Sequence, residues 1–264
     1  MRATLTIASG KGGVGKSTLA VNLAVALAQG GASVGLMDAD VYGPNIPIMM
    51  GVRRTPKVAG KRIKPLEAHG VKLMSIGFFV DVDKPLILRG PMLHKVLRQV
   101  LDHADWGDID YLLIDMPPGT GDVQLTLAQY VSITGALIVT TPQAVALGDV
   151  RKGIAAFERL KVPIIGVVEN MSYYHCPQCG HEAHIFAHGG GREAAERYEV
   201  PFLGEIPLDI AVREGGDRGV PITVAAPDSA PAKAIQQLAA AAVPRIDTLR
   251  WKQQRSTLIQ IEGP

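Results

Sequence analysis

The sequence predicts a doubly wound α/β domain with a mostly parallel sheet of about seven or eight strands. Short aliphatic or β-branched runs recur along the 264 residues, and longer segments with helical spacing lie between them. Several runs are apolar on both faces, as strands covered by helices on both sides must be. The first run ends in a glycine-rich turn that opens a helical segment. Strand and helix alternation of this kind builds sheets with right-handed crossovers.

Two stretches interrupt this alternation. The expected strands are residues 3–9, 33–38, 71–76, 111–115, 136–140, 163–169 and 201–206. The expected helices are residues 16–29, 91–103, 145–160, 190–199 and 231–242. Residues 51–69 are basic and rich in Pro and Gly, which predicts an exposed excursion with a small hairpin. Residues 172–189 follow directly on a strand and carry both cysteines and four of the seven histidines.

Composition predicts one domain and argues against two classes of partner. A hydrophobic content of 47% is ample for one core over residues 1–243, with residues 244–264 as a C-terminal tail. The formal charge of +2 is too small to draw the chain onto nucleic acid or an anionic membrane. The N-terminus lacks a secretory signal pattern, and the apolar runs are far shorter than the ~20 residues that span a bilayer. We therefore expect a cytoplasmic protein that binds neither nucleic acid nor a membrane.

A phosphate-binding loop follows the first expected strand. Residues 10–17, GKGGVGKS, fit the pattern G-x-x-x-x-G-K-S between a strand and a helix, which is the context that supports a P-loop. Backbone N–H groups and the helix N-terminus would face the phosphates. Lys16 is expected to reach the β and γ phosphates, and Ser17 to offer its hydroxyl to Mg²⁺. The fold expected is thus a three-layer P-loop NTPase. The nucleotide-binding residues expected in this segment are Gly10, Lys11, Gly12, Gly13, Val14, Gly15, Lys16, Ser17 and Thr18.

Acidic residues end two of the expected strands beside this loop. Asp115 ends the apolar run YLLID and has the form of a Walker B aspartate, which holds Mg²⁺ through water because a hard cation prefers such oxygens. Asp38 and Asp40 follow the second strand, and Asp38 is expected to support Mg²⁺ or the nearby backbone. Either could instead cap the strand end. Residues 117–121, PPGTG, suit a loop that moves with the γ-phosphate, with a rigid turn as the alternative.

The two cysteines predict a metal centre rather than a disulfide, because a reducing compartment disfavours structural disulfides. Cys176 and Cys179 lie on one tight turn and can chelate one metal or one cluster edge. A tetrahedral zinc and a four-iron cluster each normally take four ligands, so a two-fold dimer would supply the missing pair. One alternative is a zinc site within one chain that uses His181 and His184, and another is a thioredoxin-like redox pair.

Several motifs together resemble one protein family. DADVYGPNIPIMMG, DYLLIDMPPGTGD, GVVENMSYY-x-CPQCG and FLGEIPLD are similar to the Mrp/ApbC iron-sulfur cluster carrier family over roughly residues 1–240. The second lysine of the loop, Lys11, resembles the signature lysine of the deviant Walker A ATPases, the group of MinD, ParA and the nitrogenase iron protein. The resemblance implies an ATPase that binds a labile 4Fe-4S cluster between two subunits and passes it to apo-proteins.

The resemblance also assigns roles to residues. It implies that Cys176 and Cys179 hold the cluster and that Lys11 crosses a homodimer interface to the partner's nucleotide. Lys11, Lys16 and Asp40 are then the expected catalytic residues, with Asp40 orienting the attacking water. Hydrolysis is expected to be slow because no additional arginine finger is evident.

Residues on the base side of the nucleotide indicate ATP. Asn170 matches the position that reads adenine in related ATPases, and Pro207 and Asp209 resemble a second base-side loop. The guanine-reading motif Asn-Lys-x-Asp is absent from the sequence. The alternative functions are a MinD- or ParA-like positioning ATPase and a zinc-stapled nucleotide-binding adaptor. The tail, residues 244–264, is either a packed or frayed terminus or a short membrane-targeting helix like that of MinD.

Overall fold

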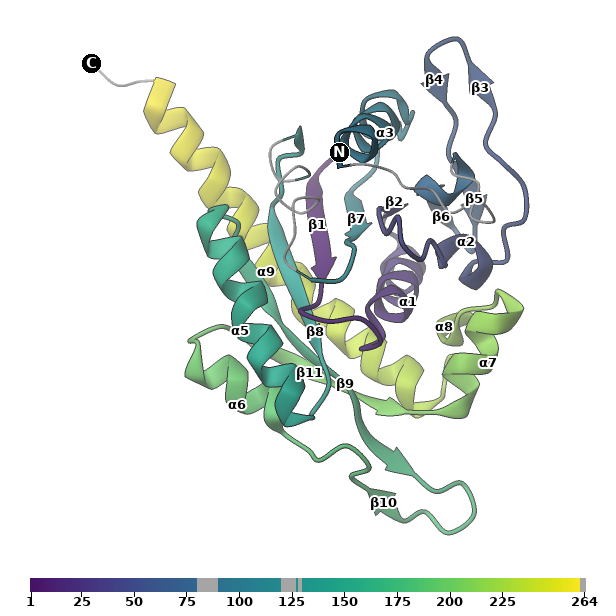
Figure 1. The fold of residues 1–264 in the computed structure, drawn as a ribbon, viewed down its shortest axis with the longest axis vertical. Helices are drawn as coiled ribbons and strands as arrows, with labels where there is room; N and C mark the ends of the chain where they lie inside the picture. The colour runs from purple at the N-terminus through teal and green to yellow at the C-terminus, as the bar shows by residue number, and fades with distance from the viewer. Residues whose placement is uncertain (80–89, 120–126, 128–129, 262–264) are drawn as a thin grey trace.

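Seven parallel strands form the centre of a nine-stranded sheet, and two short antiparallel strands extend it. The computed structural model describes residues 1–79, 90–119, 127 and 130–261 (Figure 1). The hydrogen-bonded order is β10-β9-β8-β1-β7-β2-β6-β5, with β11 paired to β9. The strands of this sheet are β1 (Ala3–Ala8), β2 (Val34–Asp38), β5 (Leu66–Ala68), β6 (Val71–Ser75), β7 (Tyr111–Asp115), β8 (Gly135–Thr140), β9 (Ile164–His175), β10 (Glu182–Ala183) and β11 (Phe202–Leu208).

Helices cover both faces of the sheet and produce three layers (Figure 1). α1 and α9 pack on one face, whereas α3, α5 and α6 pack on the other. Side chains of β7 alternate between the two faces of the sheet. Leu113 packs in the first core, beneath α1 and α9, while Leu112 and Ile114 pack in the second core, beneath α3, α5 and α6. The helices are α1 (Lys16–Gln29), α2 (Ile46–Met49), a 3-10 turn (Ile76–Phe78), α3 (Gly90–His103), α5 (Ala144–Arg159), α6 (Gly190–Arg197), α7 (Ile210–Arg218), α8 (Ile222–Ala225) and α9 (Ala230–Ile261).

The expected fold is confirmed, and the differences have local causes. All seven expected strands and five expected helices are present. The expected hairpin within residues 51–69 is formed by β3 (Val58–Ala59) and β4 (Arg62–Ile63). The sheet has nine strands rather than seven or eight, because β5 and β10 are too short to produce a sequence pattern. The patterns also miss α2, α7 and α8, which have four to nine residues. Part of the PPGTG run, residues 120–121, lies outside the described residues.

Strand register brings the carboxyl ends of the central strands level. Asp38 of β2 is paired with Asp115 of β7 on one side and with Ser75 of β6 on the other. β1 lies between β7 and β8, with β2 and β6 beyond β7 on one side and β8 and β9 on the other, so the strand order reverses beside β1. Ligand sites of doubly wound sheets form outside the carboxyl ends at such a reversal of strand order.

The last helix continues well beyond the end expected from the sequence. α9 runs through Pro244 to Ile261 instead of ending near residue 242. Ile246 is 1% exposed in the first core, and the Gln253 side-chain amide donates to the Ile133 carbonyl at 3.2 Å. Trp251, in contrast, is 57% exposed. The expected tail is therefore helical as far as Ile261, and it packs on the body through Ile246 and Gln253. No helix of the described ranges is both long and apolar enough to cross a bilayer.

Replacement of Ile246 tests whether this extension belongs to the core. We expect Ile246→Ala to lower the free energy of unfolding by about 2–4 kcal/mol, because it removes a buried side chain and leaves a cavity. Trp251→Ala, the control on the exposed side, should change it by no more than about 0.5 kcal/mol. Urea unfolding followed by circular dichroism measures both. Equal small losses in the two variants contradict a packed extension.

Candidate nucleotide and metal-binding sites

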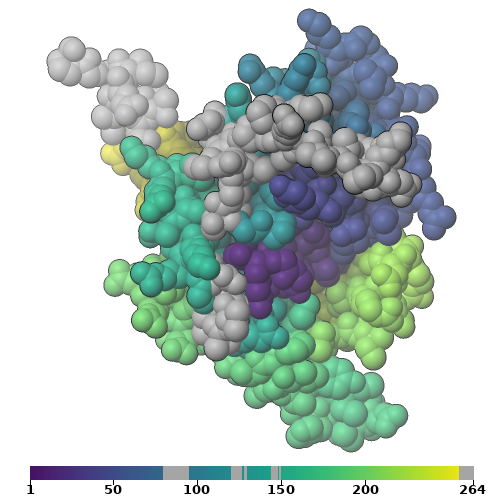
Figure 2. Space-filling model, in the orientation of Figure 1, coloured from purple at the N-terminus to yellow at the C-terminus, as the bar shows by residue number. Residues whose placement is uncertain are grey.

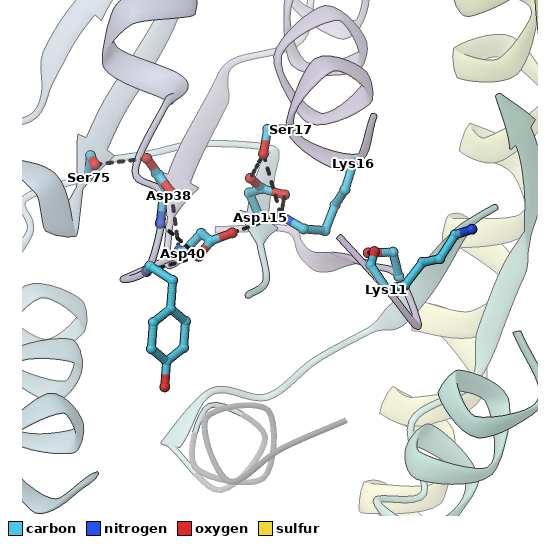
Figure 3. A network of polar contacts seen from close by, with 10 residues as sticks. Lys11, Lys16, Ser17, Asp38, Asp40, Ser75 and Asp115 are labelled. Carbon is cyan, nitrogen blue, oxygen red and sulfur yellow. Dashed lines mark hydrogen bonds and ion pairs between the residues drawn. The ribbon is translucent and has the colours of Figure 1, made fainter. Parts of the chain in front are cut away.

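The P-loop lysine and serine both bind the carboxylate that ends β7. Lys16 Nζ lies 2.6 Å from Asp115 Oδ1, and Ser17 Oγ donates to Asp115 Oδ2 at 2.6 Å (Figure 3). Both residues open α1, which starts directly after the glycine-rich loop, while Asp115 comes from the neighbouring strand. Lys16 and Asp115 are buried, so this ion pair is shielded from water. The structure thus brings together the three residues expected to contact phosphate and Mg²⁺.

Asp38 forms a second buried carboxylate beside this group. It accepts hydrogen bonds from Ser75 Oγ at 2.9 Å and from the Asp40 backbone at 3.1 Å. Burial raises the pKa of Asp38 to about 7, and the nearby charge of Asp115 adds to this effect. Burial also raises the pKa of Asp115, while Lys16 opposes the increase. Two crowded carboxylates and the Ser17 hydroxyl form an oxygen-rich set that suits Mg²⁺, whose charge would relieve their repulsion.

Asp40 lies where the loop after β2 faces the phosphate-binding segment. Its Oδ1 accepts from the backbone N–H groups of Tyr42 and Gly43 at 3.1 and 3.3 Å. Its Oδ2 lies 3.7 Å from Lys16 Nζ. These contacts fix the carboxylate in a tight turn, with 8% of the residue exposed at the cavity wall. A carboxylate held in this way can accept a hydrogen bond from water near the phosphate end.

Asn170 contacts the P-loop from the sheet. Its side-chain amide donates to the Val14 carbonyl at 2.9 Å. Gly15 adopts a left-handed backbone with φ of 83°, and a Cβ there would lie 2.1 Å from Asn170 Nδ2. The glycine is therefore required both for the turn and for the close approach of Asn170.

Two adjoining cavities are lined by the residues expected to bind the nucleotide. One has a volume of about 370 Å³ and is lined by P-loop residues together with Asp40 and Pro118. The other, of about 560 Å³, is lined by Asn170, Pro207 and Asp209 among others. Gly13, Gly15 and Thr18 line both. The carboxylate of Asp209 also caps α7 by accepting from the Ala211 N–H at 2.8 Å. A smaller cavity at the P-loop thus adjoins a larger one beside Asn170 and α7.

Lys11 points away from the cluster around Lys16 (Figure 3). Its Nζ donates to Gln143 Oε1 at 3.1 Å, just before α5. The Lys11 carbonyl also accepts from Ser9 Oγ at 2.9 Å. The two lysines of the loop therefore have different partners within one chain.

The cysteine pair lies on a hairpin that projects from the body at the end of β9 (Figures 1 and 2). The Cys176 N–H donates to the His181 carbonyl at 2.9 Å, and the Gly180 N–H donates to the Cys176 carbonyl at 2.9 Å. Cys176 is half-buried, and Cys179 is exposed. Hydrogen bonds from the backbone of Cys179 and Gln178 and from the Cys179 thiol lower the pKa of Cys176. Cys176 is therefore predisposed to act as a thiolate ligand.

The histidines of the hairpin have other partners. His184 lies 3.1 Å from Glu182 and stacks on His188 at 4.4 Å between ring centroids. Within the described ranges, three ligand-type side chains that come within 4.8 Å of one another are Glu169, His188 and Glu205, and this group contains neither cysteine. The alternative of a zinc site that combines the cysteines with His181 and His184 in one chain thus finds no support in this geometry.

Sequence patterns miss three residues of these sites. Ser75 is the hydrogen-bond donor to Asp38, and only the pairing of β2 with β6 brings them together. Gln143 is the partner of Lys11, although the two are far apart in sequence. Glu169 is fully buried next to Asn170, and its charge within an apolar strand is a signal that sequence alone could offer.

The sequence matches a family model and curated relatives that are described as iron-transfer or iron-sulfur proteins. The profile of the family described as ParA, NUBPL iron-transfer P-loop NTPase, matches residues 1–243. An iron-sulfur cluster carrier protein of Synechocystis is 53% identical over 243 residues, covering 89% of this chain and 68% of the relative. The Arabidopsis thaliana mitochondrial iron-sulfur protein required for NADH dehydrogenase is 47% identical, covering 98% of this chain and 84% of the relative. With the Escherichia coli iron-sulfur cluster carrier protein, identity is 50%, and the match spans only 64% of that protein.

Solved structures show the same architecture. A nucleotide-binding protein from Archaeoglobus fulgidus in complex with ADP has a TM-score of 0.74 and 38% identity, covering 86% of this chain and 89% of that one. The cell division ATPase MinD from Pyrococcus furiosus has a TM-score of 0.69 and 27% identity, covering 91% of this chain and 98% of that one.

The buried Asp38 predicts a pH effect on the nucleotide-free protein. Its pKa is raised from 3.8 to about 7, so between these values the unfolded chain loses a proton that the folded chain retains. The contribution of Asp38 is complete below pH 3.8, is lost as the pH rises to about 7, and stays lost above it. Asp38→Asn should make this decline shallower and stabilise the protein at pH 7 by up to about 4 kcal/mol. Urea unfolding with a chelator at several pH values measures it. Parallel profiles for variant and wild type contradict the raised pKa.

Proposed function

Because this chain belongs to the family of NUBPL-type iron-transfer P-loop NTPases, we propose that it hydrolyses ATP, holds a 4Fe-4S cluster between two copies and delivers the cluster to apo-proteins. The proposal includes a homodimer that works in the cytoplasm, without nucleic acid or membrane as a partner. The cluster is the cargo, and ATP is the substrate of the NTPase site.

The cysteine pair on the projecting hairpin is the observation that carries the proposal. Cys176 and Cys179 lie close together on a projecting hairpin, and one chain offers two cysteine ligands where a four-iron cluster normally takes four. A two-fold axis beside the hairpin would bring in an equal pair. The hairpin continues a strand that ends at the same edge of the sheet as the P-loop, so one dimer interface can include both sites.

The nucleotide site supplies residues for each step of hydrolysis. Lys16 would exchange its contact with Asp115 for the β and γ phosphates, and Ser17 and Asp115 would hold Mg²⁺. When bound, Mg²⁺ neutralises phosphate charge and orients the phosphates. Asp40, fixed by two backbone N–H groups, would orient the attacking water. Asn170 would read adenine in the larger cavity.

Lys11 is the residue that we propose acts across the dimer. Its ammonium group has only a neutral partner of its own chain, Gln143, among the contacts described for it. A hydrogen bond to a neutral amide is weaker than one to a phosphate, so the triphosphate bound to a partner subunit can replace Gln143 as the acceptor. ATP would then draw two copies together, and hydrolysis would release them. The positioning-ATPase and zinc-adaptor alternatives lack such a combined role for Lys11 and the cysteines.

Cysteine substitution tests the cluster site. Anaerobic reconstitution with iron and sulfide should yield about two irons per chain, half of a four-iron cluster, and visible charge-transfer absorbance. Cys176→Ser and Cys179→Ser should each lose the absorbance and most of the iron while nucleotide binding persists. His181→Ala is the matched control and should retain the cluster. Loss of metal in that control, or tightly held zinc in place of iron, contradicts the proposal.

Subunit mixing tests whether Lys11 acts on the partner's nucleotide. Lys11→Ala should lower ATP hydrolysis about a hundredfold with little change in nucleotide affinity, because it removes a charge from the transition state. Lys16→Ala should lose nucleotide binding. A mixture should regain activity, since a Lys16→Ala chain can lend its Lys11 to the nucleotide of a Lys11→Ala chain. Mixed dimers that form but stay inactive contradict action in trans.

A further inference from the structure

A buried carboxylate closes the base of the cysteine hairpin. Glu169 lies on β9, is 0% exposed, and forms no ion pair with a Lys or Arg in the part of the chain that the structure describes. A fully buried glutamate without such a partner is rare, because removing its charge from water is costly. Its environment must therefore stabilise the charge through hydrogen bonds.

The donors to Glu169 come from both ends of the hairpin. At the start, Ser172 Oγ donates to Oε1 at 2.6 Å. At the end, the Gly189 N–H donates to the same oxygen at 3.1 Å, and the Gly191 N–H donates to Oε2. One carboxylate thus joins the two ends of the segment that holds the cysteines. The donors at the end also open α6, where the helix dipole favours a negative charge.

The charged side chains nearest to Glu169 pair with Glu205 instead. His188 Nε2 lies 3.1 Å from Glu205, and Arg192 lies 3.4 Å from the same carboxylate. The atoms of Glu169, His188 and Glu205 are close enough for a shared cation, but both oxygens of Glu169 already accept protein hydrogen bonds. This geometry favours a structural contact over a ligand role for Glu169.

We propose that Glu169 is a positioning residue that clamps the two ends of the cysteine hairpin to β9, the strand whose Asn170 contacts the P-loop. The next residue along β9, Asn170, bonds to the P-loop carbonyl of Val14, so the clamp and the nucleotide site share one stretch of backbone. The clamp limits the opening of the hairpin and keeps Cys176 and Cys179 where a partner pair can meet them. The effect on cluster retention rests on the proposed function, whereas the effect on hairpin opening does not.

Hydrogen exchange of the full chain tests the clamp directly. In Glu169→Gln one carboxylate oxygen becomes an NH₂ group, which cannot accept from the backbone N–H of Gly189 or Gly191 that faces it, so amides of residues 172–189 should exchange about tenfold faster or more. Ser172→Ala removes one donor and should give a smaller increase in the same segment. Glu196→Gln changes an exposed carboxylate of α6, the helix that follows the hairpin, and should leave exchange unchanged. Phe157→Leu, in the buried core beneath α5, controls for a general loss of stability.

Cluster release is the second readout. On anaerobically reconstituted protein, a ferrous chelator should remove iron about tenfold faster from Glu169→Gln than from wild type or Phe157→Leu. Hairpin exchange no faster in Glu169→Gln than in Phe157→Leu overturns the clamp. Equal chelation rates, with faster exchange, overturn its role in cluster retention. If wild type assembles no cluster, the proposed function fails, while the exchange result still decides the clamp.

Discussion

The in-register pairing of β2 with β7 is the constraint on which the nucleotide site depends. It places Asp38 and Asp115 side by side at the carboxyl ends of these two central strands, where burial makes two adjacent negative charges unfavourable. Lys16, delivered by the P-loop beside them, compensates part of that charge at 2.6 Å from Asp115. Under the proposed function, phosphate would bind Lys16 while Mg²⁺ would take its place at the carboxylates, so the site would exchange one set of charges for another.

A single strand connects this site to the cysteines. β9 carries Glu169 and Asn170 beside the P-loop and continues to His175, directly before Cys176. Within the strand, Met171 adopts a left-handed backbone with φ of 56°, which bends the chain between the two sites. The ends of the hairpin are thus hydrogen-bonded to Glu169, while Cys179 near its tip is exposed.

Local patterns predicted the architecture because the informative signals were local. The alternation of apolar runs located every central parallel strand, and the P-loop motif located Lys16 and Ser17. The partners that complete the sites were not predictable in this way. Ser75 reaches Asp38, and Gln143 reaches Lys11, only through tertiary pairing. The continuation of α9 to Ile261 was missed because Pro244 reads as a helix end, whereas packing of Ile246 and Gln253 holds the helix beyond it.

The central claim is that one chain holds only half of the iron-sulfur site. Native mass spectrometry of the anaerobically reconstituted protein measures this directly, because it gives the number of chains and the inorganic mass of each species. The account predicts a cluster-loaded species of two chains with one four-iron cluster, and unloaded monomers beside it. A single chain that carries a complete cluster, or one that carries a bound zinc, would contradict it.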